Sequence, residues 1–177
     1  MLIAITGNTL SGKTTLANQL EELGLNKIVT YTNRPIRESE EDGVDYHFVS
    51  DEEIMKEKYF GKRFFYTAYR EEPFIYGMNL DDLMVSHYQD CVIVTDPRGL
   101  RAIKDEIGYR NVVSVYVNVQ PETIKARALH RGDSLEEVSR RLKKDYEDFV
   151  SAPFYADIVY NEDSSFEELI NTIEVNM

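Results

Sequence analysis

The chain has 177 residues, of which 20 are lysine or arginine and 32 are aspartate or glutamate, giving a formal net charge of −12. This length allows one domain with a full core and a small inserted lobe. The negative charge disfavours nucleic acid polymers and membrane surfaces as partners, so a bound anion would have to be held by local arginines. Every apolar run is shorter than the roughly 20 residues that span a bilayer. We therefore expect a cytoplasmic protein, in which the single cysteine, Cys91, is buried and inert.

The first expected strand, residues 2–6, leads directly into the motif G-x-x-x-x-G-K-[ST], the phosphate-binding P-loop. Its members are Gly7, Asn8, Thr9, Leu10, Ser11, Gly12, Lys13 and Thr14. Glycines let the backbone N–H groups face phosphate oxygens, Lys13 adds a mobile positive charge, and Thr14 offers a hydroxyl to Mg²⁺. A helix begins around Thr15, and its N-terminus favours the same anion. A bland glycine-rich turn is the alternative, but the order of strand, loop and helix indicates a nucleoside triphosphate site.

Four further β-branched runs follow, at residues 27–31, 91–95, 112–119 and 157–160, with helical patterns between most of them. Such alternation predicts an α/β fold with a parallel five-stranded core sheet flanked by helices. Near the C-terminal end, Ser165 lies three residues before Glu168 in an amphipathic pattern, which predicts a capped helix.

Residues 34–89 interrupt this alternation with an aromatic, charged and irregular segment. We interpret the segment as an inserted lobe, with a short helix over 51–58 and a strand over 64–67. The chain would then be one domain, whose core comprises residues 1–33 and 90–177.

Arg34 and Arg37 open this segment and precede a strand that carries Tyr46. Paired guanidiniums make bidentate contacts with phosphate, and a tyrosine hydroxyl can add a hydrogen bond. On an acidic chain this pattern predicts a site for a phosphate monoester. Two solvated arginines that pair with Glu38 or Glu40 are the alternative.

With these residues the chain resembles the guanylate kinase family of nucleoside monophosphate kinases over nearly its whole length. It is similar to the family run T-x-R-x-P-R-x-G-E-x-x-G-x-D-Y-x-F-V-S at Arg34, Arg37, Glu40, Gly43, Asp45, Tyr46, Phe48, Val49 and Ser50. Shorter matches are Tyr76 and Gly77 for Y-Y-G-[ST], Asp96 and Gly99 for D-x-x-G, Arg127, Arg131 and Gly132 for R-x-x-x-R-G, and Val159 and Asn161 for V-x-N. Leu10 stands where the family usually has a third glycine, and Pro35 is displaced from its usual place before Arg37.

The resemblance implies a kinase that uses ATP and Mg²⁺ and phosphorylates a small-molecule nucleoside monophosphate. The acceptor phosphate would be held by Arg34, Arg37, Tyr46 and Tyr76, and a lid over residues of about 122–145 would bring Arg127, Arg131 and Arg141 onto the triphosphate. Lys13 would contact the β- and γ-phosphates, and Asn161 would lie near the adenine. Thr14 would bind Mg²⁺ through its hydroxyl, and Asp96 would orient the ion through a water molecule. Independently, the i, i+4 spacing of Arg127 and Arg131 puts both on one helix face, which could instead be a solvated face. The sequence is compatible with a homodimer.

Three positions that read guanine in the family differ or are only partly kept here. Thr30 can serve as the hydroxyl, but the glutamate position falls on Tyr66 and the acid or amide position on Val94. Glu71 or Glu72 is a candidate replacement for the glutamate. GMP or dGMP follows from the family, whereas dTMP, dAMP or a modified pyrimidine would fit an altered base pocket. A noncatalytic binding module and a kinase for a metabolite other than a nucleotide are further alternatives, which an intact Lys13 and the arginine pair disfavour.

Overall fold

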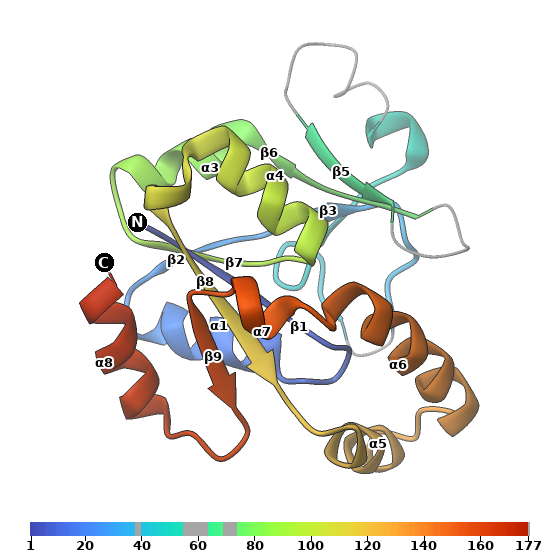
Figure 1. The fold of residues 1–177 in the computed structure, drawn as a ribbon. Coiled ribbons are helices and arrows are strands. Elements are labelled where there is room, and N and C mark those ends of the chain that lie inside the picture. The colour runs from blue at the N-terminus through green and yellow to red at the C-terminus, as the bar shows by residue number, and fades with distance from the viewer. Residues whose placement is uncertain (38–39, 55–63, 69–73, 177) are drawn as a thin grey trace.

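A computed structural model describes residues 1–37, 40–54, 64–68 and 74–176 of the chain (Figure 1). Its core is a parallel five-stranded sheet with the strand order β2-β7-β1-β8-β9, as the sequence predicts. The strands are β1 (Leu2–Gly7), β2 (Asn26–Ile28), β7 (Cys91–Val94), β8 (Val112–Asn118) and β9 (Ile158–Asn161). All six residues of β1 are buried, as expected for the middle strand of a sheet covered on both faces.

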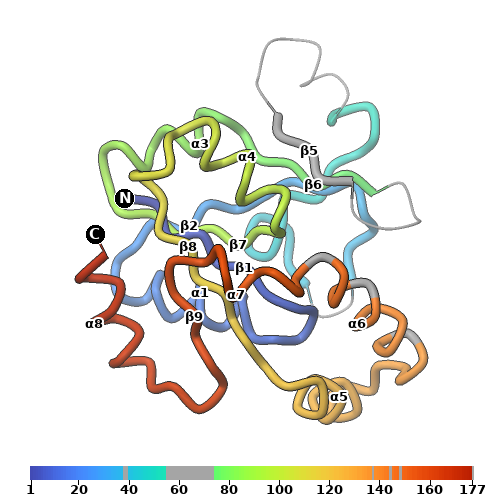
Figure 2. The backbone as a smooth tube through the Cα atoms, in the orientation of Figure 1, coloured from blue at the N-terminus to red at the C-terminus, as the bar shows by residue number. Residues whose placement is uncertain are grey.

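Alternate residues of β1 supply the two cores on either side of this sheet. Ile3 and Ile5 pack in the cluster that includes buried residues of α1 (Lys13–Glu22) and α8 (Phe166–Asn176). Leu2 and Ala4 pack in the opposite cluster, which includes α4 (Pro97–Ile107). The helices α5 (Pro121–His130), α6 (Leu135–Phe149) and α7 (Ala152–Tyr155) lie between β8 and β9 in the chain (Figure 2).

The predicted strand over residues 27–31 is wrong as a single element. Its first part is β2, which pairs with β7 in the core sheet, whereas Tyr31 begins β3 (Tyr31–Thr32) in a second sheet. Residues 28–32 are all β-branched or aromatic, with no turn residue at the break, so the sequence pattern does not reveal which neighbours each half will pair with.

The second sheet has the order β4-β3-β6-β5, and three of its strands lie in the segment that interrupts the core, whereas β3 lies just before that segment. Its other strands are β4 (His47–Phe48), β5 (Phe64–Ala68) and β6 (Ile75–Asn79), so the strand predicted over 64–67 is confirmed. Residues 51–54 are helical, and the remainder of the helix predicted over 51–58 lies outside the described residues. The chain then runs through α3 (Leu80–Met84), the 3₁₀ turns at Val85–His87 and Tyr109–Asn111, and the core elements. The division into core, lobe and lid stays a prediction.

Two local predictions are confirmed. Before α8, the Ser165 N–H donates to Glu168 Oε2 at 3.0 Å and the Glu168 N–H donates to Ser165 Oγ at 3.1 Å, which is a capping box. Cys91 is fully buried, and burial raises the pKa of its thiol, so the thiolate is disfavoured. Across the described ranges, no helix is both long and apolar enough to cross a membrane.

Candidate active site

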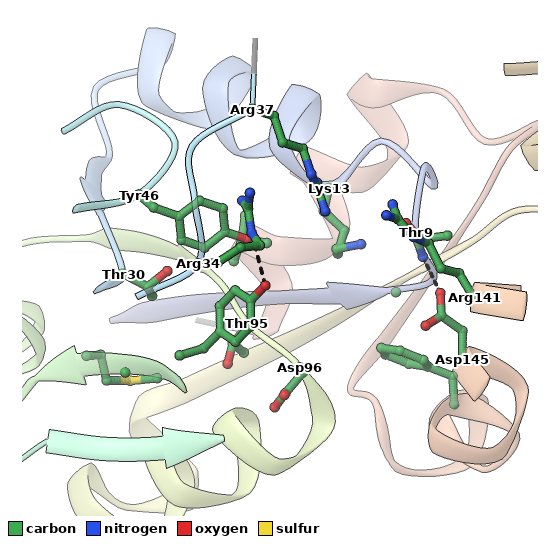
Figure 3. A pocket seen from close by; sticks show the side chains of 16 residues that line it. Thr9, Lys13, Thr30, Arg34, Arg37, Tyr46, Thr95, Asp96, Arg141 and Asp145 are labelled. Carbon is green, nitrogen blue, oxygen red and sulfur yellow. Dashed lines mark hydrogen bonds between the residues drawn. The ribbon is translucent and has the colours of Figure 1, made fainter. Parts of the chain in front are cut away.

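A cavity lies beyond the carboxyl ends of β1 and β7, where ligands bind in open α/β sheets (Figure 3). It is lined by Gly7, Thr9, Lys13, Thr30, Arg34, Arg37, Tyr46, Tyr76, Gly77, Met78, Val94, Thr95, Asp96, Arg141, Asp145 and Phe149. The core sheet, the second sheet and α6 all contribute. The structure therefore brings the P-loop and the predicted acceptor residues to one space.

Backbone geometry explains the glycines that shape the P-loop. Gly7 has a φ of 154°, and a Cβ there would lie 2.7 Å from the backbone oxygen of Val117 on the neighbouring strand β8. Gly12 has a φ of 101°, a conformation that side chains rarely adopt. Leu10 has a φ of 58° and so takes the left-handed conformation at the position where the family usually has glycine. Leu10 also packs against the buried core cluster of α1, which offsets part of the cost of that conformation.

The P-loop presents charge and polar groups to the cavity. Lys13 lies at the N-terminus of α1, lines the cavity, and donates from Nζ to the backbone oxygen of Asn8 at 2.6 Å. Within the described structure, the buried side-chain oxygens of Asn8 and Ser11 have no hydrogen-bond partner. Buried polar atoms of this kind are normally satisfied by a ligand, ion or water. Thr14 and Thr15 are exposed in the first turn of α1 and are not among the cavity-lining residues.

Arg34 is fixed in place on the opposite side of the cavity. Its Nη2 donates to Glu40 Oε1 at 2.8 Å, and its Nε donates to the Tyr76 hydroxyl at 3.2 Å. The guanidinium lies 5.5 Å from the ring centroids of both Tyr46 and Phe48. Burial lowers the pKa of Arg34, but its contacts with Glu40 and Tyr76 raise the pKa above its ordinary value. Arg34 does pair with Glu40, as the alternative reading predicts, but it is 8 % exposed and not a solvated surface residue.

Arg37 adds a second positive charge beside Arg34. Its side chain is 46% exposed and its Nη1 lies 3.6 Å from Glu40 Oε1, as the alternative of a solvated, paired arginine predicts. Partial burial lowers its pKa and the positive charges of Arg34 and Arg141 lower it further, although Glu40 opposes them. A bound anion would relieve this repulsion. Tyr46 completes the group: burial, followed by the neighbouring Tyr76, raises the pKa of the Tyr46 hydroxyl to about 12, so it remains neutral and can donate a hydrogen bond.

The predicted lid arginines lie in three different environments. Arg141 on α6 lines the cavity. Arg127 on α5 donates from Nη1 to the backbone oxygens of Leu10 and Ser11, at 3.0 and 2.8 Å, and so contacts the P-loop backbone. Arg131 is on the surface, where its Nε lies 3.8 Å from Asp133 Oδ2, and it is not among the cavity-lining residues.

Asn161 also lies away from the cavity lining. Its Oδ1 accepts a hydrogen bond of 2.8 Å from Asn118 Nδ2 at the carboxyl ends of β9 and β8.

The D-x-x-G motif forms the start of α4. Asp96 caps the helix by accepting a hydrogen bond of 2.7 Å from the Gly99 N–H, and it also lines the cavity. A Cβ on Gly99 would lie 2.0 Å from Thr95 Oγ1, so glycine leaves room for another cavity residue. The motif thereby places a carboxylate and a hydroxyl side by side at the end of β7.

The base-reading positions are resolved in part. Thr30 and Val94 line the cavity. Tyr66 lies opposite Gly77 in the pairing of β5 with β6, but its side chain lies outside the described part of the structure, as do Glu71 and Glu72.

Sequence reasoning missed Thr95, Met78, Asp145 and Phe149 as cavity residues. The last two could have been found, because Arg141, Asp145 and Phe149 follow one another at four-residue spacing and share one face of α6. Thr95 adjoins the recognised Asp96, whereas Met78 carries no polar signal.

A parallel sheet with a P-loop after its central strand, facing a cluster of arginine and tyrosine side chains around the buried Arg34, defines the class as a P-loop kinase. The sequence model of the family "Guanylate kinase" matches residues 1–177, and the chain belongs to that family. It is an ATP-dependent nucleoside monophosphate kinase of the guanylate kinase type.

Individual relatives agree with this assignment. A guanylate kinase of Symbiobacterium thermophilum is 32% identical over 174 residues, which cover 92% of this chain and 78% of that protein. One from Neisseria meningitidis is 30% identical and covers 86% of this chain and 76% of its own length. The crystal structure of guanylate kinase from Anaplasma phagocytophilum superposes with a TM-score of 0.72 at 22% identity, covers 99% of this chain and 82% of its own, and supports the fold.

Proposed function

We propose that this protein transfers the γ-phosphoryl group of ATP to the 5′-phosphate of GMP or dGMP. One observation carries the proposal: Lys13 of the P-loop lines the same cavity as Arg34, Arg37, Tyr46 and Tyr76. Donor and acceptor phosphates held by these two groups would face each other across one space. Such positioning, together with charge neutralisation, supplies most of what phosphoryl transfer needs.

On the donor side, the loop from Gly7 to Thr14 would hold the triphosphate, with Lys13 on the β- and γ-phosphates. Thr15, in the first turn of α1, would lie beside the phosphates, and Asn161 would lie near the adenine. The residues present fit Mg²⁺, which is usually bound by one or two protein oxygens together with substrate phosphates and water. Thr14 would provide a hydroxyl, and Asp96 would orient a bound water. Bound Mg²⁺ would neutralise charge on the phosphates during transfer.

On the acceptor side, Arg34 and Arg37 would bind the monophosphate, with hydrogen bonds from the hydroxyls of Tyr46 and Tyr76. The anion would also relieve the repulsion that lowers the pKa of Arg37. Arg141 would stabilise the migrating phosphoryl group from α6, and Arg127 and Arg131 would approach it if α5 moves when ATP binds. A general base is not required, because the attacking phosphate oxygen is already anionic at neutral pH.

Guanine is the favoured base because several relatives of the chain bear the name guanylate kinase. The Thr30 hydroxyl lines the cavity and could accept or donate a hydrogen bond to the base, whereas Val94 offers only apolar contact. A dTMP, dAMP or modified-pyrimidine acceptor is less well supported.

The test is to incubate the protein with Mg-ATP and each common ribo- and deoxyribonucleoside monophosphate and to measure ADP formation. We expect GMP and dGMP to be the best acceptors. Faster turnover of another nucleoside monophosphate would show that its base, and not guanine, is the preferred one. No turnover with any acceptor would refute the kinase assignment. Lys13→Ala should abolish turnover in a folded protein. Lys27→Ala is the matched control. Lys27 lies on β2, donates a hydrogen bond from Nζ to Asn18 Oδ1, and is not among the cavity-lining residues.

A further inference from the structure

A carboxylate from α6 lies against the P-loop. The Thr9 N–H donates a hydrogen bond of 2.6 Å to Asp145 Oδ2, and the two residues are 136 positions apart in the chain (Figure 3). Both residues line the cavity, and Asp145 is only 1 % exposed. A buried carboxylate next to a predicted triphosphate site is unexpected, because like charges within a few ångströms repel strongly where water is scarce.

The position of Asp145 is fixed by its neighbours on α6. One turn further along, Phe149 is 5 % exposed and stacks on Tyr116 of β8, with ring centroids 6.0 Å apart. This contact anchors the C-terminal end of α6 to the core sheet. One turn earlier, Arg141 reaches the cavity. Asp145 therefore lies between an anchored end of the helix and the part that carries a cavity arginine.

P-loop N–H groups are the donors to which phosphate oxygens bind, and here one of them already has an anionic acceptor. We propose that Asp145 sets the affinity for the donor: its carboxylate occupies the Thr9 N–H and must be displaced, or must tolerate the triphosphate charge beside it, when ATP binds. This inference rests on the proposed function of the P-loop. It makes Asp145 a positioning residue that links α6 to the donor site.

A structural role alone predicts a different outcome. If Asp145 served only to satisfy the Thr9 N–H and hold α6, asparagine, which can still accept from that N–H, would leave donor binding unchanged, and alanine would loosen the loop and weaken it. If the carboxylate competes with the triphosphate, both replacements strengthen binding. The sign of the change in affinity therefore separates the two roles.

The experiment measures the dissociation constants of ATP and of inorganic tripolyphosphate by calorimetry for the wild type, Asp145→Asn and Glu147→Gln. Asparagine keeps the size and can still accept from Thr9 N–H. Glu147 is exposed on the same helix, so Glu147→Gln makes the same change in net charge away from the cavity lining. We expect Asp145→Asn to bind both probes about tenfold more tightly, which equals about 1.4 kcal/mol, and the control to change by less than about twofold.

Unchanged or weaker binding by Asp145→Asn would overturn the inference, and an equal gain in Glu147→Gln would reduce it to an effect of net charge. Asp145→Ala provides a second variant, which should also bind tripolyphosphate more tightly if it is folded by circular dichroism. Failure of the wild type to bind ATP would overturn the proposed donor site as well. Normal ATP binding by the wild type with no gain in Asp145→Asn would refute only the role of Asp145.

Discussion

Arg34 Nη2 lies 2.8 Å from Glu40 Oε1, and their side chains are only 8 % and 12 % exposed. Burial raises the pKa of Glu40, but hydrogen bonds from the Arg34 side chain and the Arg37 backbone outweigh burial and bring the pKa below its ordinary value. The pair therefore holds a buried positive charge in place at the predicted acceptor site. Glu40 should contribute most to stability when no bound phosphate compensates the charge of Arg34.

Glu40→Gln should destabilise the protein without bound nucleotide by about 3 kcal/mol, because it leaves the buried Arg34 charge uncompensated. Saturating GMP should reduce this loss, since the phosphate would take over the compensation. Urea unfolding with and without GMP measures both values. Glu41→Gln, at an exposed neighbouring carboxylate, is the control. An equal loss with and without GMP would argue against a phosphate beside Arg34.

Tyr76→Phe should raise KM for the monophosphate about tenfold, with a smaller effect on KM for ATP. The hydroxyl accepts from Arg34 Nε at 3.2 Å, and a hydrogen bond to a charged group contributes roughly 1.5–3 kcal/mol. Steady-state kinetics with each substrate varied in turn gives the two constants. Tyr88→Phe should behave as wild type, because Tyr88 is 90% exposed. A larger effect on the ATP constant would move Tyr76 out of the acceptor site.

Gly7→Ala should lower the free energy of unfolding by more than about 2 kcal/mol. The added Cβ would lie 2.7 Å from the Val117 backbone oxygen, in addition to the unfavourable φ of 154°. Gly24→Ala isolates the backbone effect, because Gly24 has a φ of 100° but no atom within 4 Å of the added Cβ. We expect that control to lose only about 1 kcal/mol in denaturant unfolding. Equal losses would show that the P-loop can shift away from β8 at little cost.

The carboxylate of Asp157 should contribute to the loss of stability at acidic pH. Burial raises the pKa of its carboxyl, but hydrogen bonds from Ser114 and Lys104 together lower it below its ordinary value. The folded state then binds the proton more weakly than the unfolded state, so this stabilisation is complete above the ordinary pKa of about 4 and is lost as the pH falls through the lower folded value. Asp157→Asn should therefore flatten the fall in stability below about pH 4.

Urea unfolding of wild type and Asp157→Asn across this pH range measures the slope. Asp163→Asn, at an exposed carboxylate just after β9, is the control and should retain the wild-type slope. A wild-type slope in Asp157→Asn would mean that the Ser114 and Lys104 contacts do not hold the carboxylate in solution.

Sequence by itself determined the features that depend on local chemistry. The P-loop is a run of neighbouring residues, the capping box at Ser165 and Glu168 spans one turn, and the alternation of strands and helices requires a parallel sheet. The arginine pair in the interrupting segment likewise indicated a phosphate site, because guanidinium geometry suits phosphate whatever the fold.

Tertiary structure alone decided which distant groups meet. It separated β2 from β3, put Arg127 of α5 against the P-loop backbone, and brought Arg141 of the next helix, α6, to the cavity. It also placed Asp145 on the Thr9 N–H across 136 positions of sequence. Contacts of this kind depend on how helices pack on the sheet, and a local pattern of residue types specifies which face of a helix is buried but not which loop that face will touch.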